Sequence, residues 1–410
     1  MVVSVFTLGC KTNLYESGQI IGALQKSGHE AFHGLKKADV FVLNTCAITR
    51  EAEKKSRQLV ARARRLNPRC RVVVVGCASQ KNADRFKDIP NVSFIMGTAD
   101  KTRVAEEICG SGVDVEEIPS VFCEEGFAAQ ERTRAFVKIQ DGCNNFCSYC
   151  IVPYLRGRSR SRRIRDVVAE VRAAASAETV LIGIDISQFG RDTGETLAEL
   201  LLALRDVPTR VRLGSLEAGV VTEDMLSAAA NINFCPHFHL SLQSGCDSVL
   251  RRMNRKYTTA QYSEAVKRIR NVFPDAGITT DVIVGFCGET EEEFAQTCLF
   301  VRQTEFADVH VFPYSPREGT AAYSLPDVDN KVKTARAAAL GEIKGRLKRN
   351  FAEKFCGKTC QVLCERQKNG LFEGYTAEYL RVYYEKGSVG KVEQVKILSP
   401  YLDGAKGEKV

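Results

Sequence analysis

Three cysteines gathered in one short loop constrain this chain more than any other feature of its sequence. Cys143, Cys147 and Cys150 fall within eight positions, directly after a strand-like run from Ala135 to Ile139. Four thiolates saturate an iron–sulfur cluster, whereas three leave one iron free to take an outside ligand. The spacing therefore predicts a reactive metal site with an open coordination position.

A zinc knuckle is the competing interpretation of these thiols. Zinc knuckles use Cys-x-x-Cys pairs completed by a fourth Cys or His. The next such residues along the chain are the distant Cys235 and His237, so the iron–sulfur interpretation is favoured. Tyr149 completes the pattern Cys-x-x-x-Cys-x-aromatic-Cys, which resembles the motif of the radical S-adenosylmethionine (SAM) enzymes.

Length and composition fit an enzyme of two or three domains. The 410 residues are 44% hydrophobic and 26% charged, which is ordinary for a globular protein. No run approaches about 20 apolar residues, so no membrane span is expected. The apolar start, Met1 to Leu8, is too short for a secretory leader. With sixteen cysteines, we expect metal ligation in a reducing, cytoplasmic location and no membrane partner.

The first 110 residues alternate short apolar runs with helical patterns. Near-continuous apolar strands separated by helices are typical of a parallel sheet covered on both faces. We therefore expect a doubly wound α/β domain over residues 1–110, with strands at Val2–Leu8, Val40–Leu43, Val72–Val75 and Val92–Ile95 and helices at Tyr15–Lys26 and Glu51–Leu66.

Three more cysteines occupy equivalent places in this domain. Cys10, Cys46 and Cys77 each follow one of the first three expected strands. The carboxyl ends of parallel strands meet at one edge of a sheet, where ligands bind. A single cysteine there would be taken as a small buried hydrophobe, but three in the same topological position predict a second metal site with three thiols.

A second α/β block is expected over residues 132–352, after a linker at 111–131. Strand and helix patterns alternate six times, which predicts an incomplete α/β barrel with the Cys143 loop after its first strand. Residues 353–410, with short alternating strands between Gly turns, predict a small β-barrel. The central strands are expected at Ala135–Ile139, Val180–Ile184, Val211–Gly214, His237–Leu242, Gly277–Val284 and Val309–Phe312.

Eight short motifs together resemble the radical SAM methylthiotransferases, over residues 1 to about 398 and including a C-terminal RNA-binding β-barrel of the TRAM type. They are Gly9–Asn13, Asn44–Cys46, Gly76–Cys77, Cys143–Cys150, Ser241–Gly245, Arg251–Tyr257, Asp281–Phe286 and Phe312–Arg317.

The resemblance implies two four-iron, four-sulfur clusters that face one another across a shared cavity. Cys143, Cys147 and Cys150 would hold the catalytic cluster that binds and cleaves SAM. The triad Cys10, Cys46 and Cys77 would hold an auxiliary cluster that carries the sulfur to be inserted. A reductant such as flavodoxin or ferredoxin and a sulfur donor would be partners. SAM itself would be bound at the barrel rim, beside Tyr149, by Asp185, Ser215, Glu217 and Gln243, although each of these polar residues could equally cap a loop.

Charge indicates a nucleic-acid substrate. The net charge is +8, and residues 151–165 hold six arginines and no acidic residue. Beside a reactive cluster such a run suits phosphate contacts, although a solvated basic loop is the simpler alternative. We expect RNA contacts from Arg156, Arg158, Arg160 and Arg162. A second basic stripe comprises Lys54, Lys55, Arg57, Arg62, Arg64 and Arg65.

Within the family, residues 138–162 most resemble the branch that acts on tRNA N6-threonylcarbamoyladenosine beside the anticodon, adding a methylthio group to C2 of the adenine. The alternatives are the N6-isopentenyladenosine branch and the branch that modifies an aspartate of a ribosomal protein. The basic run argues against a protein substrate but does not separate the two modified adenosines. An iron–sulfur protein that binds RNA or senses redox state without turnover is an alternative of another class, but it would not explain the rim residues or the open coordination positions.

Overall fold

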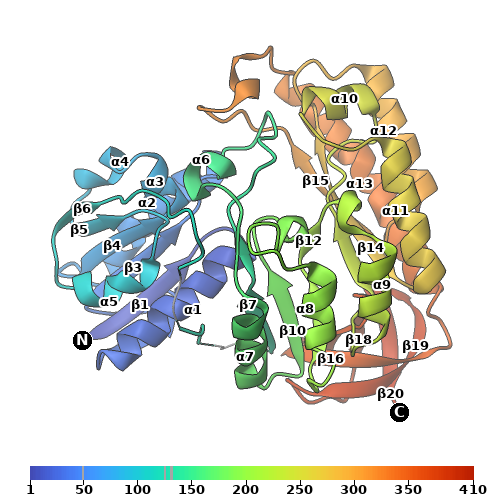
Figure 1. The fold of residues 1–410 in the computed structure, drawn as a ribbon, viewed down its shortest axis with the longest axis horizontal. Helices are drawn as coiled ribbons and strands as arrows, with labels where there is room; N and C mark the ends of the chain where they lie inside the picture. Colours follow the sequence, from blue (N-terminus) through green and yellow to red (C-terminus); the bar gives the residue numbers. More distant parts are fainter. Residues whose placement is uncertain (49, 124–125, 130–132) are drawn as a thin grey trace.

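Two α/β units and a small β-barrel follow one another along the chain (Figure 1). This computed structural model describes residues 1–48, 50–123, 126–129 and 133–410. No helix in these ranges is long and apolar enough to span a membrane.

Six parallel strands form the N-terminal sheet in the order β2-β1-β3-β4-β5-β6. The four expected strands are present to within two residues, as β1 (Val2–Thr7), β3 (Val40–Thr45), β4 (Arg71–Gly76) and β5 (Val92–Met96). Helix α1 (Lys11–Lys26) covers one face and α2 (Arg50–Leu66) the other. Because both faces are buried, the strands are almost continuously apolar.

The two edge strands of this sheet were not expected. They are β2 (Glu30–His33) and β6 (Gly112–Asp114), which are short and only partly buried, so they lack the apolar run that marks a central strand. Strand β6 lies inside the stretch expected to be a linker. Residues 124–125 and 130–131 of that stretch lie outside the described residues.

The central unit is an open, parallel half-barrel that contains all six expected strands. It divides at Gly214 into the sheets β11-β10-β7 and β12-β13-β14-β15. Its main helices lie outside the strands (Figure 1). The strands are β7 (Arg134–Lys138), β10 (Glu178–Ile182), β11 (Arg210–Leu213), β12 (Ser215–Leu216), β13 (His237–Leu240), β14 (Gly277–Val284) and β15 (Asp308–Pro313), and the helices are α7 (Ile164–Ala174), α8 (Leu197–Ala203), α9 (Glu223–Ala230), α11 (Thr259–Val272), α12 (Glu291–Thr304) and α13 (Asn330–Glu353).

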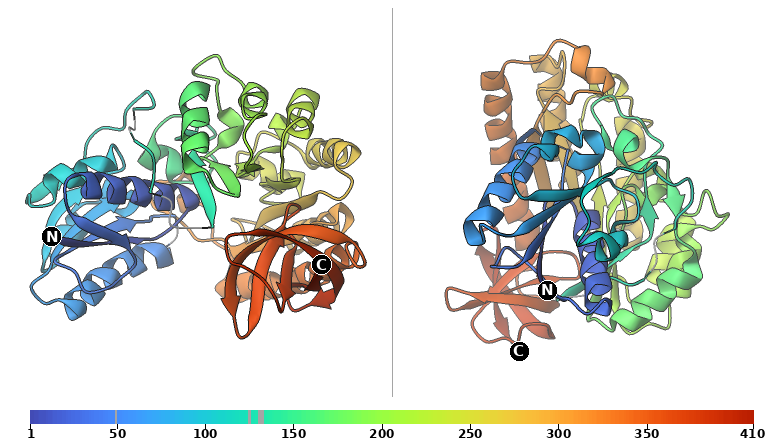
Figure 2. Two further views of the ribbon diagram at one scale, coloured as in Figure 1. Left: turned by 90° about the horizontal axis from the view of Figure 1, so that it is seen from below. Right: turned by 90° about the vertical axis from the view of Figure 1, so that its left-hand side faces the viewer.

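Five strands close into the C-terminal barrel in the order β16-β17-β18-β20-β19. Sequence patterns predict four of them, at residues 359–364, 370–377, 380–384 and 392–398, whereas the fifth, β20, has the weakly patterned sequence Gly-Ala-Lys-Gly-Glu-Lys. It closes the barrel between β18 and β19. The strands are β16 (Thr359–Lys368), β17 (Leu371–Thr376), β18 (Arg381–Tyr384), β19 (Val392–Tyr401) and β20 (Gly404–Lys409). Figure 2 shows this barrel and the N-terminal unit as separate bodies, each against the central unit.

One buried carboxylate anchors the barrel to the central unit. Glu178, in β10, is fully buried and pairs with Arg134, Arg210 and Arg212 at 2.5 to 2.7 Å. Arg212 also donates 2.9 Å to the carbonyl of Ala377, between β17 and β18. Burial raises the pKa of Glu178, but the charges of Arg212 and Arg134 outweigh it and bring the pKa to about 2.

We predict that Glu178→Gln lowers the free energy of unfolding by on the order of 3 kcal/mol at neutral pH. This is the free energy that corresponds to lowering a carboxyl pKa from about 4.5 to about 2. A lowered pKa contributes stability above about pH 5 that is lost as the pH falls through about 2. Thermal unfolding should therefore separate variant and wild type at pH 7, and the difference between them should narrow as the pH falls to 3. The exposed Glu385→Gln is the control. A difference that does not change with pH would contradict this account.

Candidate active site

The loop of Cys143, Cys147 and Cys150 lies just past the carboxyl end of β7, between β8 (Gln140–Asp141) and α6 (Val152–Arg156). Gly142 has φ +73°, and a Cβ there would lie 2.0 Å from the carbonyl oxygen of Arg158. Only glycine fits so close an approach. Asn254 donates 2.9 Å to the carbonyl of Phe146 and fixes the middle of the loop.

The second triad lies at the carboxyl ends of three neighbouring strands, as expected. Cys10 precedes α1, Cys46 follows β3, and Cys77 begins α3 (Cys77–Lys81) after β4. Asn13 ties two of these strand ends together, because its Nδ2 donates 2.8 Å to the carbonyl of Leu8 and 2.9 Å to that of Thr45.

The thiols of both triads are suited to hold a metal centre. None of the six cysteines in the two triads forms a disulfide. Burial, with the neighbouring thiols adding to it, raises the pKa of Cys46 to about 11 and that of Cys150 to about 12. The pKa of Cys143 is also raised, by burial and by Asp185. Such thiols become thiolates readily only when a cation compensates their charge, as a bound metal does.

Two of the proposed rim residues, Asp185 and Glu217, meet at the Cys143 loop. Asn145 Nδ2 donates 2.9 Å to Asp185 Oδ2 and 3.0 Å to Glu217 Oε1. Asp185 Oδ2 also lies 3.8 Å from the Sγ of Cys143. Burial raises the pKa of Glu217 despite the nearby charge of Arg255. The two carboxylates thus lie together beside the thiols, where sequence alone had placed them only at separate strand ends.

The other proposed cofactor contacts lie apart from this pair. Ser215 is on the wall of the cavity described below. Gln243 has φ +65°, its N–H donates 2.8 Å to the carbonyl of Asp281, and it bridges to β14. The ring of Tyr149 packs edge-on against Phe286, with centroids 6.3 Å apart.

Two residues of this site, Asn145 and Arg255, were missed by sequence reasoning. Arg255 donates 3.3 Å to the Sγ of Cys147 and pairs with Glu217 at 2.8 Å. Its place in the Arg251–Tyr257 motif was the available signal, and Asn145 is inside the cysteine loop itself.

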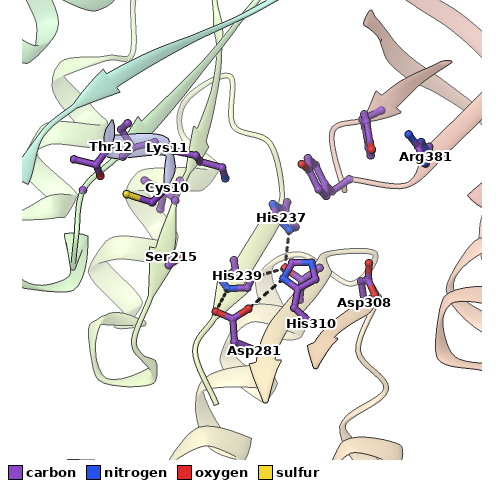
Figure 3. A pocket seen from close by; sticks show the side chains of 18 of the residues that line it. Cys10, Lys11, Thr12, Ser215, His237, His239, Asp281, Asp308, His310 and Arg381 are labelled. Carbon is purple, nitrogen blue, oxygen red and sulfur yellow. Dashed lines mark hydrogen bonds and ion pairs between the residues drawn. The ribbon is translucent and has the colours of Figure 1, made fainter. Parts of the chain in front are cut away.

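A cavity of about 600 Å³ joins the three units. Cys10 and Ser215 line it (Figure 3). Val152, two residues past Cys150, lines it too. On its floor, Asp281 is held between His239 at 3.2 Å and His310 at 3.1 Å. Cys10 of one triad therefore lines this cavity directly, whereas the Cys143 loop adjoins it through Val152, the first residue of α6.

The expected RNA contacts of Arg156, Arg160 and Arg162 are wrong, because all three side chains are buried and paired with carboxylates. Arg156 pairs with Glu16 at 2.7 Å and Asp141 at 3.1 Å, and Arg160 pairs with Asp141 at 3.1 Å. Arg162 pairs with Glu170. Their counter-ions come from other elements, which is why the run of residues 151–165 looked unpaired in sequence.

Arg158 differs from its neighbours. It is exposed, with its guanidinium 4.4 Å from the centroid of the Phe146 ring. An arginine stacked on an aromatic ring at the surface remains available to a phosphate.

We predict that Arg156→Met lowers the free energy of unfolding by about 3–5 kcal/mol, because it leaves Glu16 and Asp141 short of a buried cation. Arg158→Met should change it by about 0.5 kcal/mol or less, since its side chain is exposed. Thermal unfolding of both variants, with tRNA affinity measured alongside, checks this. If both variants lost tRNA affinity equally and Arg156→Met kept wild-type stability, residues 151–165 would be an RNA-binding run after all.

Two protein-family models match the chain: the radical SAM superfamily over residues 137–301, and uncharacterized protein family UPF0004 over residues 2–97. Among solved structures, the radical SAM methyltransferase TsrM from Kitasatospora setae superposes with a TM-score of 0.59 at 12% identity, covering 91% of this chain and 80% of that one. The cobalamin-dependent SAM radical enzyme OxsB gives 0.53 at 10% identity, with coverage of 86% and 56%. These similarities support the fold.

Curated proteins match along nearly the whole chain. The threonylcarbamoyladenosine tRNA methylthiotransferase MtaB of Bacillus subtilis (strain 168) is 35% identical, with 98% of this chain and 95% of that protein aligned. The protein of the same name from Thermotoga maritima is 34% identical at the same coverage. The tRNA-2-methylthio-N(6)-dimethylallyladenosine synthase of Thermoanaerobacter sp. (strain X514) is 33% identical, with coverage of 98% and 92%. The chain therefore belongs to the radical SAM family of tRNA methylthiotransferases.

Proposed function

We propose that this chain adds a methylthio group to C2 of N6-threonylcarbamoyladenosine beside the anticodon of tRNA. The observation that supports the proposal is that one cavity is lined by Cys10 of one thiol triad and by Val152, two residues past Cys150 of the other. Methylthio transfer needs a radical source and a sulfur source within reach of one carbon atom. The MtaB relatives, at 32 to 35% identity, support this nucleoside as the substrate.

The cofactors of this proposal are SAM and two four-iron, four-sulfur clusters. Cys143, Cys147 and Cys150 would hold the cluster that the radical SAM family implies, and the Cys10 triad would hold a second one. When bound, these groups would supply the radical that removes the C2 hydrogen and the sulfur that replaces it. An aromatic C–H has no proton that a side-chain base could remove near neutral pH, so acid–base groups alone would not suffice.

The protein's own residues position the reactants. Asp185 and Glu217, oriented by Asn145, would accept hydrogen bonds from polar groups of SAM. Arg255 holds Glu217 in place from the other side. Tyr149 and Phe286 pack together beside the loop and would keep water away from it.

The basic face of α2 is the better candidate for contacts with tRNA phosphates. Its six exposed cations are Lys54, Lys55, Arg57, Arg62, Arg64 and Arg65. The helix begins four residues after Cys46, so RNA bound along it would lie close to the cavity. Arg158 could extend this surface. A reductant such as flavodoxin or ferredoxin, a sulfur donor and a cytoplasmic location complete the proposal.

N6-isopentenyladenosine is the second candidate substrate. Two relatives named tRNA-2-methylthio-N(6)-dimethylallyladenosine synthase are 33% and 34% identical to this chain, which is close to the identity of the MtaB proteins. Overall similarity therefore does not separate the two nucleosides, and a direct comparison of substrates does.

The test uses anaerobically reconstituted enzyme with SAM, dithionite and an anticodon stem–loop that carries either nucleoside. We expect the 2-methylthio derivative of threonylcarbamoyladenosine by nucleoside mass spectrometry, together with 5′-deoxyadenosine. The variant Cys10→Ala, Cys46→Ala, Cys77→Ala should lose about half of about eight iron atoms and the methylthio product, while still cleaving SAM.

Each alternative has its own outcome in this experiment. Product from the isopentenyl RNA alone would replace the proposed substrate. Intact clusters without 5′-deoxyadenosine would indicate an RNA-binding or redox-sensing protein. An unchanged iron content in the triple variant would remove the auxiliary cluster.

We further predict that Lys55→Gln, Arg62→Gln, Arg65→Gln weakens tRNA binding and reduces the slope of log K against log salt by about 2 to 3, because each phosphate contact releases about one counter-ion. Fluorescence anisotropy at several salt concentrations measures this slope. The charge-matched control Lys26→Gln, Lys36→Gln, Lys37→Gln removes three other exposed lysines of the same unit. Equal slopes in both variants would exclude α2 as the phosphate-binding face.

A further inference from the structure

Lys11 stands out among the charged side chains that line the 600 Å³ cavity. Within the part of the chain that the structure describes, no carboxylate lies within ion-pair distance of its ammonium group, whereas each other charged lining residue has a partner. Figure 3 shows its side chain extending from the start of α1, beside Cys10, into the cavity. Its side chain therefore faces this cavity.

The acidic groups of the cavity are already occupied. Asp281 lies between His239 and His310, Asp308 pairs with Lys344 and Lys348 at 3.3 and 3.2 Å, and Asp403 pairs with Arg381 at 2.8 Å. The nearby cations are occupied too. Arg134 and Arg212, which line the adjoining cavity together with Lys11, both pair with Glu178. Among the described residues that line the cavity, Lys11 is thus the cation left for a bound anion.

We propose that Lys11 binds the carboxylate of the threonylcarbamoyl group and so distinguishes this nucleoside from one with an apolar N6 substituent. This inference rests on the proposed function and names the residue that selects its substrate.

The chemistry of the nucleoside favours the carboxylate over a phosphate. In adenine, C2 and C6 both adjoin N1, so a group on N6 lies near the atom that receives sulfur. The phosphates lie beyond the ribose. Lys11 follows Cys10, a proposed ligand of the sulfur-carrying cluster, and is therefore on the correct side of the cavity. An isopentenyl group in the same place would bury the ammonium without a partner, which is costly.

The test compares Lys11→Met with wild-type holoenzyme on two anticodon stem–loops, one with the free threonyl carboxylate and one with its methyl ester. We expect wild type to bind the acid about tenfold more tightly than the ester, the usual scale for a charged hydrogen bond. Lys11→Met should bind both as weakly as wild type binds the ester. Lys11→Arg should keep the preference, and Lys26→Met, at the other end of α1, should match wild type.

Binding is measured by fluorescence anisotropy, methylthiolation by nucleoside mass spectrometry, and iron content on every sample. Equal affinity of wild type for acid and ester would overturn the inference without recourse to any variant. An equal loss on both RNAs in Lys11→Met would assign Lys11 to a phosphate instead. If wild type discriminates but forms no methylthio product, the proposed function fails while the carboxylate contact stands.

Discussion

The arrangement of the site depends on one buried network of charges between the N-terminal and central units. Arg156 donates 2.6 Å to Asn13 Oδ1, and Asn13 in turn holds the strand ends beside Cys10 and Cys46. On its other side Arg156 pairs with Asp141, which accepts 2.8 Å from the N–H of Gly142, next to Cys143. A continuous chain of polar contacts thus connects the two thiol loops.

Glu16 completes this network and explains why so many charges can be buried. It pairs with Lys101, Lys138 and Arg156, which come from three other elements. Burial raises its pKa, but these three cations outweigh burial and bring the pKa well below its ordinary value. A buried charge is tolerated when it is paired in this way, and removing one member leaves the others uncompensated. The same interactions therefore hold the fold together and fix the position of the loops.

Charge serves three different purposes in this protein. Where two units meet, buried arginines pair with carboxylates and stabilise the interface. Glu178 does so between the central unit and the C-terminal barrel. On the surface, the cations of α2 are exposed and suit phosphates. In the cavity, Lys11 has no carboxylate within ion-pair distance among the described residues, and it suits the substrate anion proposed above. Net charge and local runs of arginine do not distinguish these roles, because burial and partners decide between them.

The sequence by itself determined the elements and the thiol positions. Apolar runs marked all six central strands, and cysteines at strand ends marked both triads. Strand ends can be recognised from neighbouring residues, and the carboxyl ends of parallel strands lie at one edge of the sheet. The edge strands β2 and β6 were missed since little of their surface is buried, and β20 was missed because its sequence is weakly patterned. Only the tertiary structure decided which charges meet. Arg156 and Glu16 are 140 positions apart, and no local pattern encodes a contact made by packing two separate units together.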